Sequence, residues 1–154
     1  MAQHIEDILE SEGVFASTSA GVSMWPLLRN RRDTVVISRV EPGQRLRRYD
    51  VPLYRRGDAY VLHRIVDVGE DHYVICGDNC SALEHVPFDC VIGVLSQAYR
   101  GERQVNLEGA PYQAYSRAWV ALYPFRRGAR VVRGALARAL LRGVWRSIRR
   151  KDAR

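Results

Sequence analysis

The fold is decided by a stretch near the middle of the chain, Ala59-Tyr60-Val61-Leu62-His63-Arg64-Ile65-Val66-Asp67-Val68. It is rich in β-branched and aromatic residues, and glycine-containing turns flank it at residues 56–58 and 69–71. This composition between turn residues predicts one β-strand. Side chains of a continuous strand alternate between two faces, so Val61, His63 and Ile65 are expected on the same face.

Further stretches of the same kind lie on both sides of this one. Short runs rich in apolar residues occupy residues 34–38, 51–55, 72–76, 88–99 and 103–107. No interval between them is long enough for the helical crossover that parallel strands need. The sequence therefore predicts a mainly β (α+β) body with an antiparallel sheet or barrel.

A short helix is expected at the N-terminus. Residues 2–12 place three apolar side chains on one face, those of Ile5, Ile8 and Leu9. Gly13 follows, and glycine commonly ends a helix. This helix and the strands together make up one expected β-domain, residues 1–108.

The remainder, residues 109–154, differs from the body in periodicity and in charge. Residues 112–119 have helical character, and residues 130–150 repeat apolar side chains four apart among arginines, as a basic amphipathic helix does. Residues 117–154 carry twelve Lys and Arg against one acid, whereas the preceding part carries twelve against sixteen. An acidic body with a basic extension favours a catalytic or binding module with an attachment element.

The basic helix at residues 130–150 has three interpretations. Its arginines, its apolar stripe and Trp145 fit a segment that lies on an anionic membrane surface or on a partner. The second interpretation is packing of the apolar stripe on the body. Contact with nucleic acid is the least favoured.

Composition limits the location and the chemistry of the protein. No apolar run approaches the roughly 20 residues of a membrane-spanning helix. Three cysteines, Cys76, Cys80 and Cys90, lack the paired spacing of a zinc site. They are expected to stay reduced, as core residues of a cytoplasmic protein or of one held at the inner face of the membrane. No metal or cofactor is expected.

A candidate nucleophile lies in the segment Ser23-Met24-Trp25-Pro26, where the proline prevents a helix from continuing. A serine hydroxyl is a poor nucleophile until a neighbouring base removes its proton, and lysine and histidine are the common bases. The only lysine is Lys151, within the basic segment. His63, on the predicted strand, is therefore the best candidate base.

Several short motifs occur in order along the chain: Ser23-Met24-x-Pro26, Asp50-Val51, His63-Arg64-Ile65, Gly77-Asp78-Asn79 and Val91-Ile92-Gly93. Together they resemble the boxes of signal peptidase I and its relatives, the serine peptidases that share a β-fold with LexA-type repressors. Histidine at the base position is similar to the endoplasmic-reticulum and archaeal branch. The resemblance implies a signal peptidase/LexA-like β-body, Ser23 as nucleophile, His63 as general base, and a peptide or protein as substrate.

The resemblance also suggests which acid orients the imidazole of His63. In the histidine-type enzymes an aspartate six residues after the Gly-Asp-Asn aspartate has this role, and Glu84 occupies that position here. Asp78 belongs to the box itself, which is mainly structural in the family. Glu84 is therefore the first choice for the orienting acid, and Asp78 is the second.

The same resemblance implies that the backbone N–H of Ser23 contributes to an oxyanion hole. A hydroxyl often assists from two residues before the nucleophile, where this chain has Gly21. Ser19 is an alternative source of that hydroxyl.

Two other functions compete with peptidase activity. A non-enzymatic module would keep the β-body and dock on a membrane or a nucleic acid through residues 130–150. A LexA-like self-cleaving regulator is disfavoured, because residues 2–12 are too short for a helix-turn-helix domain. The membrane-spanning anchor of signal peptidases has no counterpart here, so the expected peptidase acts in the cytoplasm or at the inner leaflet.

Overall fold

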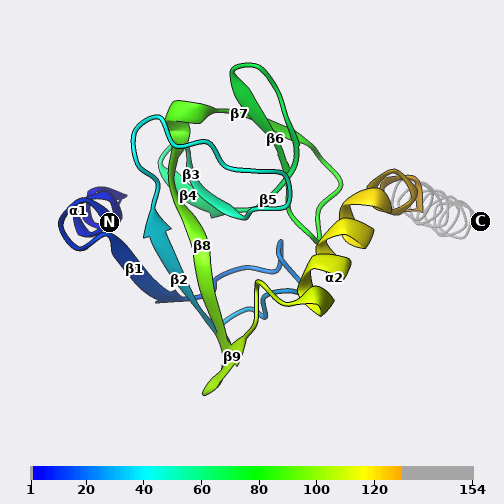
Figure 1. Ribbon diagram of the computed structural model, residues 1–154, viewed down its shortest axis with the longest axis horizontal. Helices are drawn as coiled ribbons and strands as arrows, with labels where there is room; N and C mark the ends of the chain where they lie inside the picture. The colour runs from blue at the N-terminus through cyan, green and yellow to red at the C-terminus, as the bar shows by residue number, and fades with distance from the viewer. Residues whose placement is uncertain (1, 130–154) are drawn as a thin grey trace, which may run out of the picture. The chain divides into compact units, whose positions relative to one another are not determined.

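The computed structural model describes residues 2–129, and this part of the chain is mainly β (Figure 1). The amphipathic helix predicted for residues 130–150 lies outside the described residues. The chain divides into two compact units between Val120 and Ala121. The predicted boundary after residue 108 falls before the helix α2 (Ala110–Ala121), whereas the first compact unit includes that helix as far as Val120.

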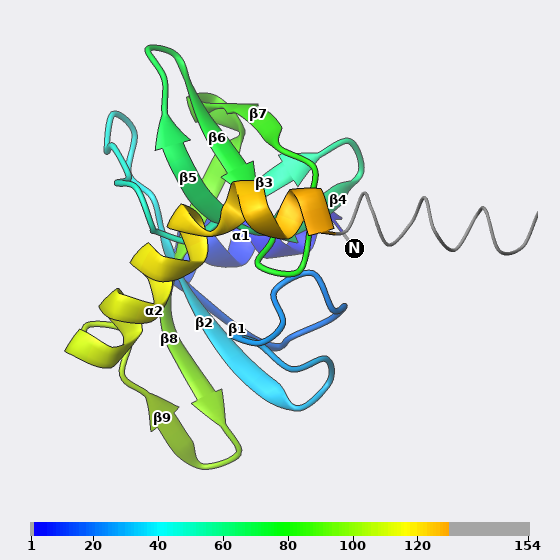
Figure 2. The same ribbon diagram turned by 90° about the vertical axis from the view of Figure 1, so that its right-hand side faces the viewer.

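The strands of the first unit form two antiparallel sheets. The larger sheet has the order β1-β2-β8-β3-β4, with β9 paired to β8, and the smaller has the order β5-β6-β7. Figure 2 shows β5, β6 and β7 above the long strands β2 and β8. The bounds are β1 (Val14–Thr18), β2 (Asp33–Arg39), β3 (Pro52–Arg56), β4 (Ala59–Leu62), β5 (Arg64–Val68), β6 (His72–Cys76), β7 (Glu84–Pro87), β8 (Val91–Arg100) and β9 (Arg103–Val105).

The prediction of one continuous strand over residues 59–68 is wrong. The stretch breaks at His63, where β4 ends in the larger sheet and β5 begins in the smaller. β4 pairs with β3 as far as Leu62, whereas β5 pairs with β6 from Arg64 onward. His63 therefore lies at the corner between the two sheets. The alternation expected for one strand fails, because His63, Arg64 and Ile65 are all buried.

Two neighbouring segments also differ from the sequence-based expectation. Residues 84–87 form the strand β7, although no strand is predicted there. Residues 88–90, predicted as the start of a long strand, form the short 3-10 helix η1 (Phe88–Cys90). Antiparallel pairing with β6 supplies the hydrogen bonds that make residues 84–87 a strand, and local composition does not reveal this pairing.

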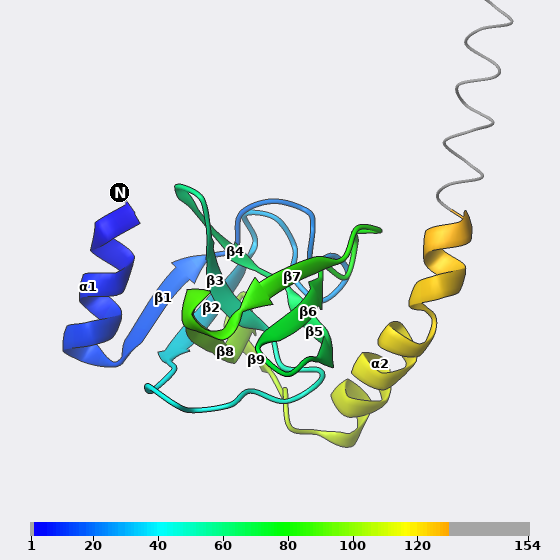
Figure 3. The ribbon, with the colours of Figure 1, turned by 90° about the horizontal axis from the view of Figure 1, so that it is seen from above.

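The helix α1 (Ala2–Glu12) covers one side of the larger sheet, as Figure 3 shows from above. It ends as predicted at Gly13, whose φ of 74° suits glycine and whose N–H donates to the Leu9 carbonyl. Leu9 is buried in the core of this sheet. A Cβ atom on Gly93 would lie 3.5 Å from Leu9 Cδ1 and 2.5 Å from Ile37 Cγ2, so helix and strands pack closely at this glycine.

The larger core cluster also holds the segment that carries Ser23. Met24, Leu27 and Leu28 are buried in it together with side chains of β2, β3 and β8. A second cluster contains Tyr54 of β3 and Ile65 of β5 and so joins the two sheets. Because both clusters are well buried, the Ser23 segment and the corner at His63 are held by packing on a rigid scaffold.

No helix within residues 2–129 is long and apolar enough to cross a lipid bilayer.

Candidate active site

Ser23 lies in a turn region between β1 and β2 that is held at both ends. The hydroxyl of Ser19 donates to the carbonyl of Arg29 at 2.7 Å, and the N–H of Ser19 donates to the carbonyl of Asp33. Met24 is buried beneath the turn, whereas Trp25 is exposed. These anchors leave Ser23 half-buried at the surface, where a substrate can reach it.

His63 is 4% exposed, and its Nδ1 atom faces two polar side chains. Nδ1 lies 3.3 Å from Glu84 Oε1 and 3.2 Å from the hydroxyl of Tyr54. Because a carboxylate only accepts hydrogen bonds, we assign the ring proton to Nδ1. This tautomer leaves a free lone pair on Nε2, as a general base requires.

Burial lowers the pKa of His63 below its ordinary value of 6.5, because a buried imidazolium loses its hydration. The negative charge of Glu84 opposes this shift, and the positive charge of Arg56 adds to it. The pKa remains lowered on balance, so His63 is neutral at neutral pH and able to accept a proton.

Glu84 is itself held by its neighbours. Both of its carboxylate oxygens accept from Arg56 NH1, at 3.2 and 3.3 Å. Burial raises the pKa of Tyr54, and the adjacent Glu84 carboxylate raises it further. The pairing of β7 with β6 places Glu84 opposite Ile75, at the end of the smaller sheet that adjoins His63.

The Nε2 side of His63 faces the Ser23 segment across Gly77. A Cβ atom on residue 77 would lie close to three atoms: 2.7 Å from the Ser23 carbonyl oxygen, 2.8 Å from Cys80 Sγ and 2.9 Å from His63 Nε2. Only glycine leaves this space open. The residues Ser23, His63 and Cys80 also line a cavity of about 470 Å³. Within residues 2–129, no hydrogen bond joins Ser23 to His63.

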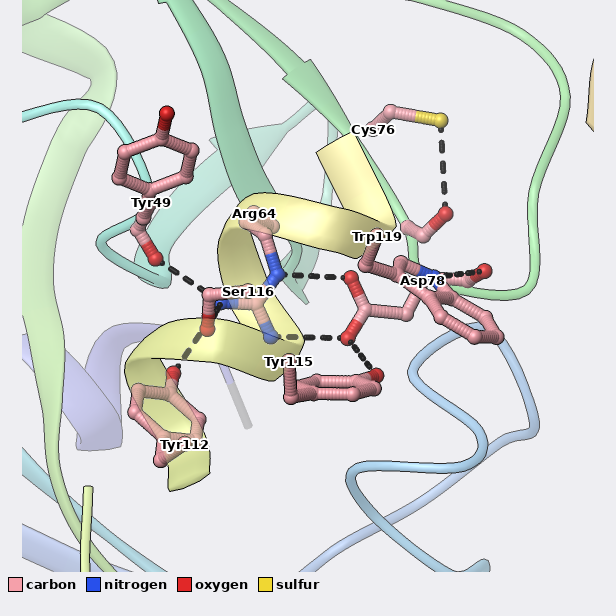
Figure 4. Close-up of polar contacts among 9 residues, drawn as sticks. Tyr49, Arg64, Cys76, Asp78, Tyr112, Tyr115, Ser116 and Trp119 are labelled. Atoms are coloured by element: carbon pink, nitrogen blue, oxygen red, sulfur yellow. Dashed lines mark hydrogen bonds and ion pairs between the residues drawn. The ribbon is translucent and has the colours of Figure 1, made fainter. Parts of the chain in front are cut away.

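Asp78 lies in a different environment from Glu84. Its carboxylate accepts two hydrogen bonds from Arg64, each 2.8 Å long, and one from the hydroxyl of Tyr115 (Figure 4). Arg64 and Asp78 are 1% and 2% exposed. Burial alone would lower the pKa of Arg64, but the hydrogen bonds and charge of Asp78 raise it, so the guanidinium stays charged. The carboxylate of Asp78 is thus engaged by Arg64, whereas that of Glu84 lies beside His63.

The residue after Asp78 connects this pair to the Ser23 turn. The backbone N–H of Asn79 donates to the carbonyl of Ser23 at 2.6 Å, and its side-chain amide donates to the carbonyl of Val22 at 3.2 Å. The Gly-Asp-Asn segment therefore places Gly77 beside His63, with no room for a Cβ atom between them, and bonds to Ser23 through Asn79.

Three groups near Ser23 could donate a hydrogen bond to a substrate oxygen, and two of them already donate to other atoms of the protein. In the described part of the chain, the backbone N–H of Ser23 makes no hydrogen bond. The N–H of Gly21 donates to Asn30 Oδ1 at 2.9 Å. Ser19, the alternative hydroxyl, donates to the Arg29 carbonyl inside the turn. The N–H of Ser23 is the donor that this geometry leaves open to a substrate oxygen.

Sequence reasoning missed several residues of this site. Tyr54 was not recognised as a neighbour of His63, although an aromatic hydroxyl that is buried on a strand needs a hydrogen-bond partner. Cys80 is predicted to be a core residue, whereas the structure places it in the lining of the cavity. Tyr115 and Trp119 are one helical turn apart, a spacing visible in the sequence that could have indicated a common contact.

A second cavity, of about 640 Å³, lies between β9, α2 and the segment that follows Ser23. Its lining includes Leu27, Arg103 and Tyr112 but no candidate nucleophile and no histidine. We therefore place the candidate active site in the cavity of about 470 Å³ that Ser23 and His63 line.

Among residues 2–129, no group of three or more His, Cys, Asp or Glu side chains is arranged to hold a metal ion. No protein-family model and no curated protein matches the chain.

Proposed function

We propose that the protein is a serine endopeptidase of the signal-peptidase-like class, with Ser23 as nucleophile and His63 as general base. The observation that carries this proposal is a buried imidazole that has a carboxylate at Nδ1 and presents Nε2 beside the nucleophile segment. The motifs in the sequence and the cavity shared by Ser23 and His63 support the same assignment.

The first half of the reaction forms an acyl-enzyme. Ser23 Oγ attacks the carbonyl carbon of the scissile peptide while His63 Nε2 accepts the hydroxyl proton. The ring N–H at Nδ1 stays directed at Glu84, whose negative charge stabilises the imidazolium. The tetrahedral intermediate then collapses, the C–N bond breaks, and His63 returns the proton to the leaving amine.

The second half restores the enzyme. His63 removes a proton from water as the water oxygen attacks the acyl carbon. The bond between this carbon and Ser23 Oγ then breaks, His63 returns the proton to Ser23 Oγ, and the carboxylic acid product leaves. In both halves a negative charge forms on the substrate oxygen, and the N–H of Ser23 is available to stabilise it. The hydrogen bond between hydroxyl and imidazole would form when substrate binds, because such contacts are often long in an unliganded enzyme.

The position of this cavity in the sheet suits an extended peptide. Its lining includes residues 15 and 17–21, in and after β1, and residues 60–63, in and after β4. These strands lie at the two ends of the order β1-β2-β8-β3-β4, so each has one edge that no strand within residues 2–129 pairs with. A peptide that added along such an edge would cross Ser23 with its scissile bond. Val22 and Trp25, both more than half exposed, would contact apolar substrate side chains.

The proposal is tested by reacting the full chain with a fluorophosphonate probe and mapping the adduct by mass spectrometry. We expect the adduct on Ser23 Oγ. Ser23→Ala should abolish labelling, and His63→Ala should slow it by about 10³-fold or more, because an unactivated hydroxyl reacts slowly.

Matched controls are available on the same scaffold. Ser96→Ala and His85→Ala change an exposed serine on β8 and an exposed histidine on β7, and both should label at the wild-type rate. Circular dichroism would verify that each variant is folded. Full labelling of folded His63→Ala, or an adduct on another residue of the wild type, would refute the assignment.

A further inference from the structure

The helix α2 presents four polar contacts to the pair formed by Arg64 and Asp78. The contacting side chains are spaced three or four apart and so share one helix face: Tyr112, Tyr115, Ser116 and Trp119. Arg64 NH1 donates to the hydroxyls of Tyr112 and Ser116, at 3.1 and 3.0 Å. Tyr115 donates to Asp78 Oδ2 at 2.8 Å. Figure 4 shows the helix crossing this pair.

Trp119 differs from the other three because it bonds to the main chain. Its indole Nε1–H donates to the backbone carbonyl of Asp78 at 2.8 Å. That carbonyl and the N–H of Asn79 belong to one peptide group, which resonance keeps planar. The N–H lies in the same plane, on the opposite side of the C–N bond from the carbonyl, and makes the 2.6 Å hydrogen bond to the Ser23 carbonyl. One rigid peptide group therefore connects Trp119 to Ser23.

Rotation of this peptide group would break both hydrogen bonds at once. The hydrogen bond from the Trp119 indole to the Asp78 carbonyl opposes this rotation. It also polarises the peptide group and so strengthens the hydrogen bond from the Asn79 N–H to the Ser23 carbonyl. The neighbouring residue on the other side, Gly77, lies so close to the imidazole that a Cβ atom added to it would be 2.9 Å from His63 Nε2. A change in the plane would thus shift the nucleophile relative to the base.

We propose that Trp119 is a positioning residue for Ser23, acting through the Asp78–Asn79 peptide group. The inference rests on the proposed function, because it gives Trp119 of α2 a role in positioning the proposed nucleophile. Displacement of reacting groups by about 1 Å can cost two orders of magnitude in rate, so loss of one hydrogen bond at this peptide suffices for a measurable effect.

The test replaces Trp119 in the full chain in two ways. Trp119→Phe keeps an aromatic ring beside Tyr115, and benzothienylalanine at the same position keeps the shape of tryptophan without the N–H donor. Both should slow fluorophosphonate labelling of Ser23 about tenfold at saturating probe, with little change in the probe concentration needed for half-maximal rate. The amide proton of Asn79 should move upfield in NMR spectra and exchange faster with solvent.

The control is Tyr112→Phe, which removes a hydrogen-bonding group from the same helix face without touching the Asp78 peptide. It should lower the melting temperature but leave the labelling rate and the Asn79 amide signal within about twofold of wild type. If both Trp119 variants keep the wild-type rate and Asn79 signal, Trp119 has only a structural role. If the wild type itself is not labelled at Ser23, the proposed function fails, whereas the Asn79 signal still decides whether Trp119 controls this peptide.

Discussion

Two features of the surroundings of His63 have opposite effects on its pKa. His63 is buried, which disfavours the imidazolium, and it lies 3.3 Å from a carboxylate, which favours it. Burial has the larger effect, so the pKa of His63 is lowered. As the proposed general base, His63 is thereby neutral at neutral pH, and Glu84 would stabilise the positive charge that forms on it in the proposed reaction.

This balance predicts the pH dependence of labelling. The rate should fall on the acid side with a midpoint below 6.5, the ordinary pKa of histidine. Glu84→Gln removes a charge that raises the His63 pKa and should move the midpoint to lower pH. Arg56→Gln removes a charge that lowers it and should move the midpoint to higher pH. Rates of fluorophosphonate labelling measured across pH in the three proteins give these midpoints.

The same shift contributes to stability with a defined sign. The unfolded chain binds the His63 proton more tightly than the folded chain, so this contribution is complete above the ordinary pKa. This stability is lost as pH falls from there through the lowered pKa of His63 in the folded protein.

The labelling prediction has a clear contrary outcome. If the midpoints of the Glu84 and Arg56 variants shifted in the directions opposite to those expected, a group other than His63 would control the fall in labelling rate at low pH.

At the scale of elements, α2 covers a buried ion pair that the β-strands alone leave incomplete. Four of its side chains hydrogen-bond Arg64 or Asp78. Burial raises the pKa of Tyr115, and the adjacent Asp78 carboxylate raises it further, so the hydroxyl remains a hydrogen-bond donor. A buried pair stabilises a fold only when its remaining polar atoms are satisfied. We therefore regard α2 as part of the β-domain.

A pair of truncated chains tests this view. A chain of residues 1–120 retains all four contacts, whereas a chain of residues 1–108 has none and leaves Arg64 and Asp78 uncovered. We expect the shorter chain to lose about 2–5 kcal/mol of unfolding free energy relative to the longer one, because hydrogen bonds to charged groups are lost. Urea denaturation followed by circular dichroism measures the difference. Equal midpoints would show that the helix adds nothing to the domain.

At the scale of the whole molecule, charge is distributed unequally along the chain. Residues 117–154 carry twelve basic residues and one acid, so the remainder of the chain is net acidic. The first interpretation of residues 130–150, attachment to an anionic membrane surface or to a partner, is a prediction from the sequence. Attachment to a membrane would bring the proposed active site close to substrates at that surface.

Vesicle sedimentation tests this attachment. The full chain should sediment with vesicles containing anionic lipid at low salt and be released at about 0.5 M salt, because screening weakens contacts between exposed charges. A chain of residues 1–120 should remain in the supernatant, and neutral vesicles should bind neither protein. Binding of residues 1–120 equal to that of the full chain would place the membrane contact on the body.

Sequence alone determined the local features of this protein. Residues 2–12 form the predicted helix, Gly13 ends it, and runs of β-branched residues between turns form a mainly β body. These features depend on periodicity and turn chemistry within a few residues, which can be seen in one short window. Ser23 and His63 could be chosen as candidates for a similar reason, since residue type and motif order suggest them.

Only the tertiary structure decided how these parts meet. The predicted strand breaks at His63 because its two halves find partners in different sheets. Glu84 reaches His63 because β7 pairs with β6, and Trp119 reaches Asp78 because α2 packs on the ion pair. Each of these outcomes depends on burial and hydrogen bonding between residues far apart in the chain, and no local pattern encodes such pairings.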